Sequence, residues 1–300
     1  MNKSKVGAVI GAVVILILGI AMIYFGLSIG AAPVVKMGDV NVSKYNDKDL
    51  KSGQIDIKAF DTLDIDVASM KVIVETGDDF AFEYKAYSEN IPNVENKGNT
   101  LKVSQKDNIF TIVDFRWIEG LNDDEYYKIT VPKDTGIIST KLKASSGDIS
   151  ISDIAMDGKI EITSGRIELK NIEGNKLVLE ATSGDIKTQN VTGDDLTVGL
   201  TSGSVVSEAS SFKNTTIKAT SGDIAFDALK TDNLKLDMTS GDALINIQGK
   251  EQDFDYKLDV TSGDVRIGNT VIDGGYSVNN GAERKIEADI TSGKIAISFR

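Results

Sequence analysis

Residues 177–186 read Leu-Val-Leu-Glu-Ala-Thr-Ser-Gly-Asp-Ile, and residues 215–224 read Thr-Thr-Ile-Lys-Ala-Thr-Ser-Gly-Asp-Ile. The shared element, Thr or Ser followed by Ser-Gly, occurs eight times between residues 145 and 293. Its serines are spaced 18, 19, 19, 19, 19, 22 and 30 residues apart and are Ser146, Ser164, Ser183, Ser202, Ser221, Ser240, Ser262 and Ser292. Such a regular period predicts a repeat architecture in which each unit stacks on the next.

Apolar and polar residues alternate on both sides of each Ser-Gly pair. The position two residues before the serine is apolar in every repeat: Ala144, Ile162, Ala181, Leu200, Ala219, Met238, Val260 and Ile290. This period of two predicts a short strand, a corner and a second short strand. One such unit cannot bury its apolar face, but units stacked about 4.8 Å apart can. We therefore predict an all-β fold in which residues 142–300 form a parallel β-solenoid of about eight coils of about 19 residues.

The Ser-Gly corners are expected to be structural. Glycine supplies the positive φ of a tight corner, and the strand alternation places the serine hydroxyls on the inward side. The corner residues predicted on this basis are Ser146, Gly147, Asp148, Ser183, Gly184, Asp185, Ser221, Gly222, Asp223, Ser240, Gly241, Asp242, Ser262, Gly263 and Asp264. Arg166, Ser204 and Lys294 replace aspartate in other repeats. Arg166 is expected to lie between two aspartates, and Lys294 at the end of their column.

A ladder of calcium ions is the alternative reading of the repeated Gly-Asp pairs. Calcium-binding β-rolls repeat every nine residues and supply several oxygen ligands per turn. Here each unit offers one carboxylate, and two corners carry cations instead. We therefore expect aspartates that stabilise turns, with no metal site and no cofactor. A catalytic role is not expected either, because an active site is a single constellation and this motif occurs in every coil.

The composition excludes several functions. The chain has 33 Lys and Arg against 45 Asp and Glu, which gives a formal charge of −12. Proteins that bind nucleic acids present a basic face, so we expect no nucleic acid partner. The sequence contains neither His nor Cys. Catalytic triads that need histidine, thiolate zinc sites and disulfides are therefore ruled out.

The first part of the chain has the sequence of a membrane anchor. Residues 6–32 carry no charge and are long enough to cross a bilayer of about 30 Å as a helix. Lys3 and Lys5 lie in the short segment 1–5, which favours a cytoplasmic N-terminus. We expect a single-pass protein of the cell membrane whose remainder is extracellular. A signal peptide cleaved near residues 28–30 is the alternative, but its apolar core would be shorter.

Residues 33–141 are predicted to form an N-terminal β region that caps the solenoid. Residues 61–74 look like a degenerate repeat in which Ser69-Met70 replaces Ser-Gly. Further strands are predicted by alternation and turn residues, at 79–87, 100–105, 109–115 and 126–131.

These features together resemble a known family. An anchor, the run 60–74, the stretch Tyr-Tyr-Lys-Ile-Thr-Val-Pro-Lys-Asp at 126–134 and the repeated Ser-Gly-Asp-Ile are similar to the DUF4097 family. This family, also labelled "putative adhesin", comprises β-strand-repeat proteins that are frequent in Gram-positive bacteria. Some membrane-anchored members are linked to cell-envelope stress operons. The resemblance implies a β-repeat fold and no catalytic residue.

Binding is expected where the repeat is interrupted. Phe115, Trp117, Tyr126 and Tyr127 form one such aromatic segment, which either plugs the end of the solenoid or offers a ligand surface. Residues 268–285 form a long excursion between the last two repeats. This excursion is expected to cover the open C-terminal edge, and a homodimer through that edge or through the anchor is the companion hypothesis.

Three functions compete at this point. A non-enzymatic, adhesin-like scaffold or binding module, tethered to the membrane and facing a cell-wall component, is favoured. A regulatory subunit that senses envelope stress through membrane protein partners is the alternative. A carboxylate-dependent polysaccharide-active enzyme is the third, with Asp123, Asp124 and Glu125 as its candidate residues. Adjacent residues of a strand point to opposite faces, which argues against that last function.

Overall fold

Each Ser-Gly repeat folds as two short strands that meet at the corner, as the alternation predicts. In the repeat around Ser183, the side chains of Leu179, Ala181 and Ile186 are buried, whereas Lys187 is exposed. Neighbouring repeats pair as parallel strands without a change of register, so that Ser164 lies beside Ser183. The prediction of an all-β fold built from stacked repeats is therefore confirmed.

The computed structural model describes residues 50–105 and 125–300. The predicted anchor at 6–32 and the strand expected at 109–115 lie outside the described residues. Within the described ranges, no helix is long and apolar enough to span a bilayer.

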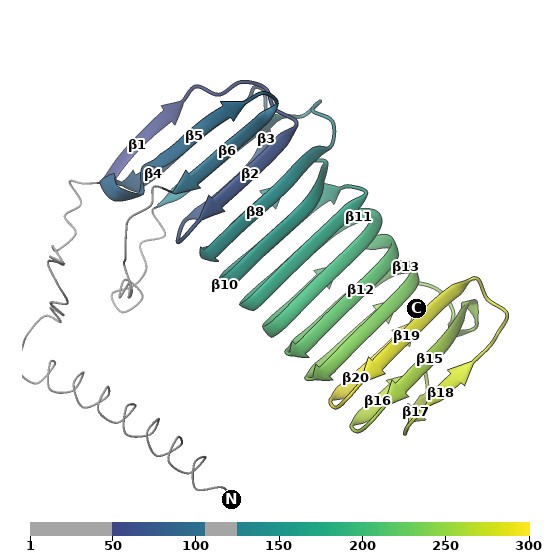
Figure 1. Ribbon diagram of the computed structural model, residues 1–300. Helices are drawn as coiled ribbons and strands as arrows, with labels where there is room; N and C mark the ends of the chain where they lie inside the picture. Colours follow the sequence, from purple (N-terminus) through teal and green to yellow (C-terminus); the bar gives the residue numbers. More distant parts are fainter. Residues whose placement is uncertain (1–49, 106–124) are drawn as a thin grey trace, which may run out of the picture. The chain divides into compact units, whose positions relative to one another are not determined.

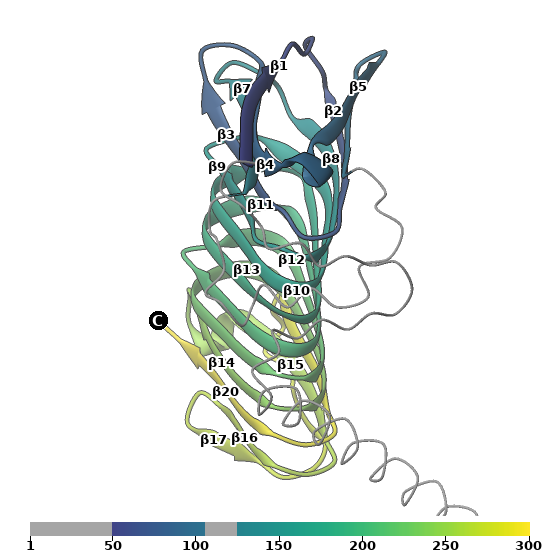
Figure 2. The same ribbon diagram turned by 90° about the vertical axis from the view of Figure 1, so that its left-hand side faces the viewer.

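The strands form two layers with the core between them. Residues that precede the corners make one layer and residues that follow them make the other, as Figure 2 shows for β2, β8 and β12 against β3, β9 and β14. The long strands β10, β11 and β13 continue from one layer into the other. In chain order the strands are β1 (Leu50–Ile55), β2 (Thr62–Val67), β3 (Lys71–Gly77), β4 (Ala81–Tyr87), β5 (Pro92–Lys97), β6 (Thr100–Gln105), β7 (Tyr126–Pro132), β8 (Ile138–Ser146), β9 (Ile149–Ser152), β10 (Met156–Glu173), β11 (Lys176–Glu208), β12 (Ser211–Ser221), β13 (Asp223–Ser240), β14 (Asp242–Ile247), β15 (Phe254–Val260), β16 (Asp264–Ile267), β17 (Thr270–Ile272), β18 (Tyr276–Val278), β19 (Arg284–Ile290) and β20 (Lys294–Phe299). Two short 3-10 turns, η2 (Ser88–Asn90) and η4 (Glu251–Asp253), interrupt them.

The N-terminal end adds antiparallel strands to this stack. Strands β2 and β3 form a full coil around Ser69-Met70 and pair in parallel with β8 and β9, so the degenerate repeat is confirmed. Strands β6 and β7 lie on the outer side of that coil. Beyond them, β5 pairs antiparallel with β6, and β4 and β1 continue the layer of β7. The coil of β2 and β3, which precedes the other coils in the chain, therefore lies inside the stack and not at its end.

The C-terminal end has the same interleaved order. Strands β19 and β20, the last in the chain, lie between the coil of β13 and β14 and the coil of β15 and β16 (Figure 1). At the corners, the Ser292 N–H donates to Thr239 O at 2.9 Å, and the Ser262 N–H donates to Thr291 O at 3.0 Å. The expectation that the last repeat forms the open edge is therefore wrong. Because all coils share one apolar pattern, the chain can return and fill a gap between two earlier coils.

The excursion at residues 268–285 covers the outermost coil. Strand β17 pairs antiparallel with β16, and β18 pairs antiparallel with β15. Each of these edge strands has three residues, and short edges offer little backbone to another chain. A homodimer through this end would have to pair with these two strands.

A second corner, not predicted from the sequence, closes five successive coils opposite the Ser-Gly corner. Its residues have a positive φ although none is glycine, and they are Asp153, Asn171, Asn190, Ala209 and Ala228. Asn171 Nδ2 donates to Asp153 Oδ1 at 2.7 Å, and Asn190 Nδ2 donates to Asn171 Oδ1 at 3.0 Å. Asn and Asp tolerate this backbone conformation better than other residues with a side chain, and their stacked amides bond from coil to coil.

Candidate functional site

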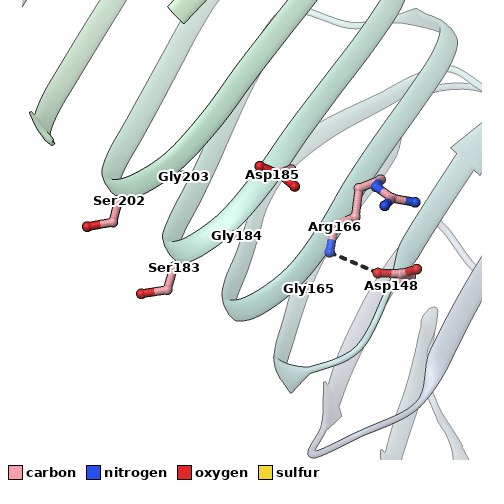
Figure 3. A pocket seen from close by; sticks show the side chains of 8 residues that line it. All are labelled: Asp148, Gly165, Arg166, Ser183, Gly184, Asp185, Ser202 and Gly203. Carbon is pink, nitrogen blue, oxygen red and sulfur yellow. Dashed lines mark hydrogen bonds between the residues drawn. The ribbon is translucent and has the colours of Figure 1, made fainter. Parts of the chain in front are cut away.

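The Ser-Gly corners form a continuous polar ridge along one side of the stack. We define the hydroxyl ridge as the Thr-Ser pairs of the eight repeats: Ser145-Ser146, Thr163-Ser164, Thr182-Ser183, Thr201-Ser202, Thr220-Ser221, Thr239-Ser240, Thr261-Ser262 and Thr291-Ser292. The first residue of every pair is exposed, and none of the serines is buried. Figure 3 shows the Ser183 and Ser202 side chains pointing away from the ribbon on the same side. The ridge thus presents two parallel rows of hydroxyl groups to solvent.

The outward direction of the serines corrects the sequence interpretation. Strand alternation places them inward, but the chain bends at this position and the alternation is interrupted there. Some of the hydroxyls bond to neighbouring coils, since Ser262 Oγ donates to Thr291 O at 3.0 Å. The remaining capacity of the ridge for hydrogen bonds faces the solvent.

Close approach of the coils explains the glycine that follows each serine. A Cβ atom at Gly203 would lie 2.2 Å from Gly184 O, and one at Gly241 would lie 2.1 Å from Gly222 O. The expectation that every corner glycine has a positive φ is wrong, because Gly147, Gly184 and Gly222 do not have one. At those three positions the carbonyl of the preceding coil still leaves no room for a side chain.

The column that follows the glycines holds both cations and carboxylates. In the order of the stack it reads Lys71, Asp148, Arg166, Asp185, Ser204, Asp223, Asp242, Lys294 and Asp264. Lys294 therefore lies between two aspartates and not at the end of the column, because its coil is inserted between two others. The interleaved order thus separates carboxylates that would otherwise stack about 4.8 Å apart and repel one another.

Aspartates of this column also hold the neighbouring coil. Asp148 Oδ1 accepts the backbone N–H of Arg166 at 2.9 Å (Figure 3). Asp185 Oδ1 accepts the N–H of Ser204 at 3.1 Å and its hydroxyl at 2.5 Å. Within residues 50–105 and 125–300, no group of three or more acidic side chains is placed to hold a metal ion. These contacts link each aspartate to the backbone of the next coil.

The aromatic residues predicted as one surface lie in different environments in the structure. Tyr127 is fully buried at the N-terminal end of the core, where its ring lies 6.0 Å from that of Phe82. Burial raises the pKa of the Tyr127 hydroxyl above its ordinary value, and the nearby Glu125 charge adds to this effect. Tyr126 is half-buried on the outside of the same strand. Tyr127 therefore belongs to the core and not to a ligand surface, while Phe115 and Trp117 lie outside the described residues.

A polar cluster that sequence reasoning missed lies beside Tyr127. We call it the Asn90 cluster, and it joins Asn90, Gln105 and Glu125. Asn90 is 4% exposed, and its Nδ2 donates to Glu125 Oε1 at 2.9 Å while its Oδ1 accepts from Gln105 Nε2 at 2.9 Å. The Tyr127 hydroxyl donates to Asn90 O.

The cluster also bonds to the backbone of adjacent strands. Gln105 Oε1 accepts the N–H of Ala68 at 2.8 Å, and Glu125 Oε1 accepts the N–H of Tyr87 at 2.9 Å. Glu125 therefore has a structural role, which weakens its candidacy as a catalytic carboxylate. Asp123 and Asp124, the other two candidates, lie outside the described residues.

Comparison with known proteins identifies the fold. A family model described as Toastrack DUF4097 matches residues 60–298. The chain belongs to this family. The resemblance seen in the sequence is therefore confirmed. No curated protein matches the chain.

Solved structures are similar to the chain at low sequence identity. A crystal structure described as a "putative lipid binding protein" from Parabacteroides distasonis has a TM-score of 0.51 and 18% identity, covering 84% of this chain and 97% of that one. A "putative adhesin" from Bacteroides fragilis has a TM-score of 0.48 and 15% identity, covering 84% and 98%. A "putative adhesin" from Parabacteroides merdae has a TM-score of 0.47 and 14% identity, covering 84% and 97%. At these identities the likeness concerns the fold alone.

The Asn90 cluster gives a testable prediction for this Toastrack chain. Asn90→Ala is expected to lower the free energy of unfolding by about 2–3 kcal/mol, because it removes the hydrogen bonds that the buried Asn90 side chain makes with Glu125 and Gln105. Asn93→Ala is the control, since the Asn93 side chain is exposed and its Nδ2 donates to Glu95 Oε1 at 3.3 Å. Urea denaturation measures both variants, and equal midpoints for the two would contradict the prediction.

Proposed function

We propose that this chain is a non-enzymatic scaffold or binding module of the cell envelope, adhesin-like in its use of a repeated surface. Residues 6–32 tether it to the membrane as a single-pass anchor, and the solenoid lies outside the cell. The sequence of the anchor and its flanking lysines support this placement. The family description names no ligand.

The hydroxyl ridge is the observation that carries the proposal. Its Thr and Ser side chains repeat from coil to coil with the spacing of parallel strands, about 4.8 Å. Each hydroxyl both donates and accepts hydrogen bonds, and single bonds of this kind contribute only about 0.5–1.5 kcal/mol. A row of them reaches useful affinity with a long ligand, because every further contact is intramolecular once the first has formed.

The charge of the chain indicates which polymer the ridge binds. The formal charge is −12, and two of the cations, Lys3 and Lys5, precede the anchor. The extracellular part would therefore repel anionic wall polymers and anionic lipid. An extended, polyhydroxylated wall polymer without net negative charge, such as a glycan strand, is the ligand class we propose.

Binding of purified wall fractions to the full-length chain tests the proposal. Thr201→Val with Thr220→Val removes two neighbouring hydroxyls of the ridge and is expected to weaken glycan binding about tenfold, which corresponds to about 1.4 kcal/mol. Thr197→Val with Thr216→Val is the matched control, because these outward residues lie on the same two coils but off the ridge. Equal binding by the two double variants, or binding of no wall polymer at all, would overturn the proposal.

A regulatory subunit that acts through membrane protein partners is the second function that an observation favours. The observation that favours it is a row of exposed apolar side chains on the outer face of the solenoid, which includes Val206 and Leu244.

A further inference from the structure

An exposed apolar stripe crosses four consecutive coils on the outer face of the layer that follows the corners. We define the apolar stripe as Val206, Ala225, Leu244 and Ala296, which are cross-strand neighbours in that order. Val206 is 39% exposed and Leu244 is 51% exposed, and the two alanines between and beside them are half-buried. Scattered surface leucines are ordinary, but here the apolar residues are contiguous.

Directly beside these four coils the same column is polar, and apolar residues return only farther away, at Ile73 and at Val271, which is 67% exposed. Towards the N-terminal end the same column continues as Lys187, Glu168 and Ser150. On the other side of the stripe it continues as Arg266. Packing within the solenoid does not require the change from polar to apolar, because all of these side chains point outward. The stripe therefore has the features of a docking surface.

Carboxylates border the stripe on both sides. Asp223 and Asp242 lie on the corner side, two residues before Ala225 and Leu244, and both are exposed. Among the described residues, no Lys or Arg forms a salt bridge with either of them within 4.0 Å. Lys294 is the next residue of that column. This border is therefore acidic beside the middle of the stripe.

The opposite border is also acidic. Glu208 lies two residues after Val206, and Asp227 lies two residues after Ala225. The Arg300 guanidinium pairs with Asp227 at 3.1 Å, and Asn246 Nδ2 donates to the same carboxylate at 3.1 Å. These contacts hold the pKa of Asp227 below its ordinary value, with the Asn246 hydrogen bond as the largest cause. Asp227 therefore stays ionised at neutral pH.

We propose that the apolar stripe docks a basic amphipathic helix of a partner protein, aligned with the axis of the solenoid. Coils repeat every 4.8 Å or so, and residues three or four apart in an α-helix are separated by about 4.5–6 Å along its axis. Apolar residues at positions i, i+3 and i+7 of a helix therefore fall on successive coils. Lys and Arg beside them on the helix reach the two acidic borders.

Charge complementarity selects this occupant over the alternatives. A second copy of the chain would bring the same acidic borders against these ones, and an anionic lipid surface would also be repelled. The proposal does not depend on the hydroxyl ridge, because the stripe and the ridge are different surfaces and no stripe residue belongs to the ridge.

A synthetic helical peptide tests the proposal on the full-length chain. The probe is a fluorescent 14-residue peptide with Leu at spacings of three and four and Lys on both flanks of the Leu face. Fluorescence anisotropy is expected to show binding that weakens at least tenfold in Leu244→Ser and in Val206→Ser. Val178→Ser is the matched control, because Val178 is an outward residue of the opposite layer and its loss is expected to leave binding unchanged.

Two further measurements test the apolar contacts and the charged contacts of the peptide separately. A peptide of the same composition with its Leu residues scrambled is expected to bind at least tenfold more weakly, and Asp223→Asn with Asp242→Asn is expected to reduce the salt dependence of binding. Equal binding of both peptides, or of wild type and Leu244→Ser, would overturn the proposal. So would sedimentation that finds a dimer of the wild-type chain dissociated by Leu244→Ser, since the stripe would then contact a second copy.

Discussion

Deletion of residues 284–300 is expected to unfold the C-terminal third of the solenoid, not to shorten it by one coil. These residues form the coil of β19 and β20, which lies between two coils made earlier in the chain. Its buried side chains include Ile286, Ile290, Ile295 and Ile297. Each buried side chain of this size contributes about 1.5–3 kcal/mol, so the deletion removes a large part of the stability of an ordinary domain.

Hydrogen exchange measures which strands unfold after the deletion. In the truncated chain, amide protection is expected to be lost in β13, β14, β15 and β16, because both flanking coils lose their partner strands. Arg300→Ala is the control, since the Arg300 guanidinium pairs with Asp227 on the surface and such pairs contribute at most about 1 kcal/mol. Protection that persists in β15 and β16 after the deletion would contradict the interleaved order.

Gly203→Ala is expected to lower the free energy of unfolding by more than about 3 kcal/mol. The φ of Gly203 is +118°, which a residue with a side chain rarely adopts. The new Cβ would also lie 2.2 Å from Gly184 O, so the two coils would have to move apart. Gly136→Ala is the control, because a Cβ there meets nothing within 4 Å and the φ lies outside the positive range.

Gly184→Ala separates the effect of the positive φ from the effect of the close approach between coils. Gly184 has no positive φ, and the atoms nearest its Cβ are Gly165 O at 2.6 Å and the flexible Cδ1 of Ile162 at 2.7 Å. The loss of unfolding free energy in Gly184→Ala is therefore expected to fall between the losses in Gly136→Ala and Gly203→Ala. Thermal or urea denaturation gives this order directly. A Gly203→Ala variant as stable as Gly136→Ala would show that the coils are not packed as closely as described.

The fold could be predicted because its signal is periodic. Apolar residues at every second position predict the strands, and a Ser-Gly pair about every 19 residues predicts the corners and the parallel stacking. The structure confirms these elements. The order of the coils could not be predicted from the same signal. Every coil presents the same alternating pattern to its neighbours, so the pattern does not say which coil lies next to which. The long spacings before Ser262 and Ser292 were the only trace of the return.

The surfaces were harder to predict than the fold. The alternation of buried and exposed residues predicts inward serines only if it continues across the corner, and it does not hold there. Asn90 gave no signal, since a buried polar residue with distant partners is not part of any repeat. The apolar stripe was visible as Val206, Ala225 and Leu244 at a spacing of 19 residues, but outward and inward apolar residues look alike without the register of the corner.

The interleaved order of the coils also sets the timing of folding during synthesis. A ribosome delivers β15 and β16 before the strands that must lie between them and β13 and β14. The newly made outer coil therefore lacks its inner neighbour until β19 and β20 have been made. The excursion at residues 268–285 is made during this interval, and by pairing with β15 and β16 it covers the other side of the outer coil. Completion of the stack thus waits for the synthesis of β19 and β20.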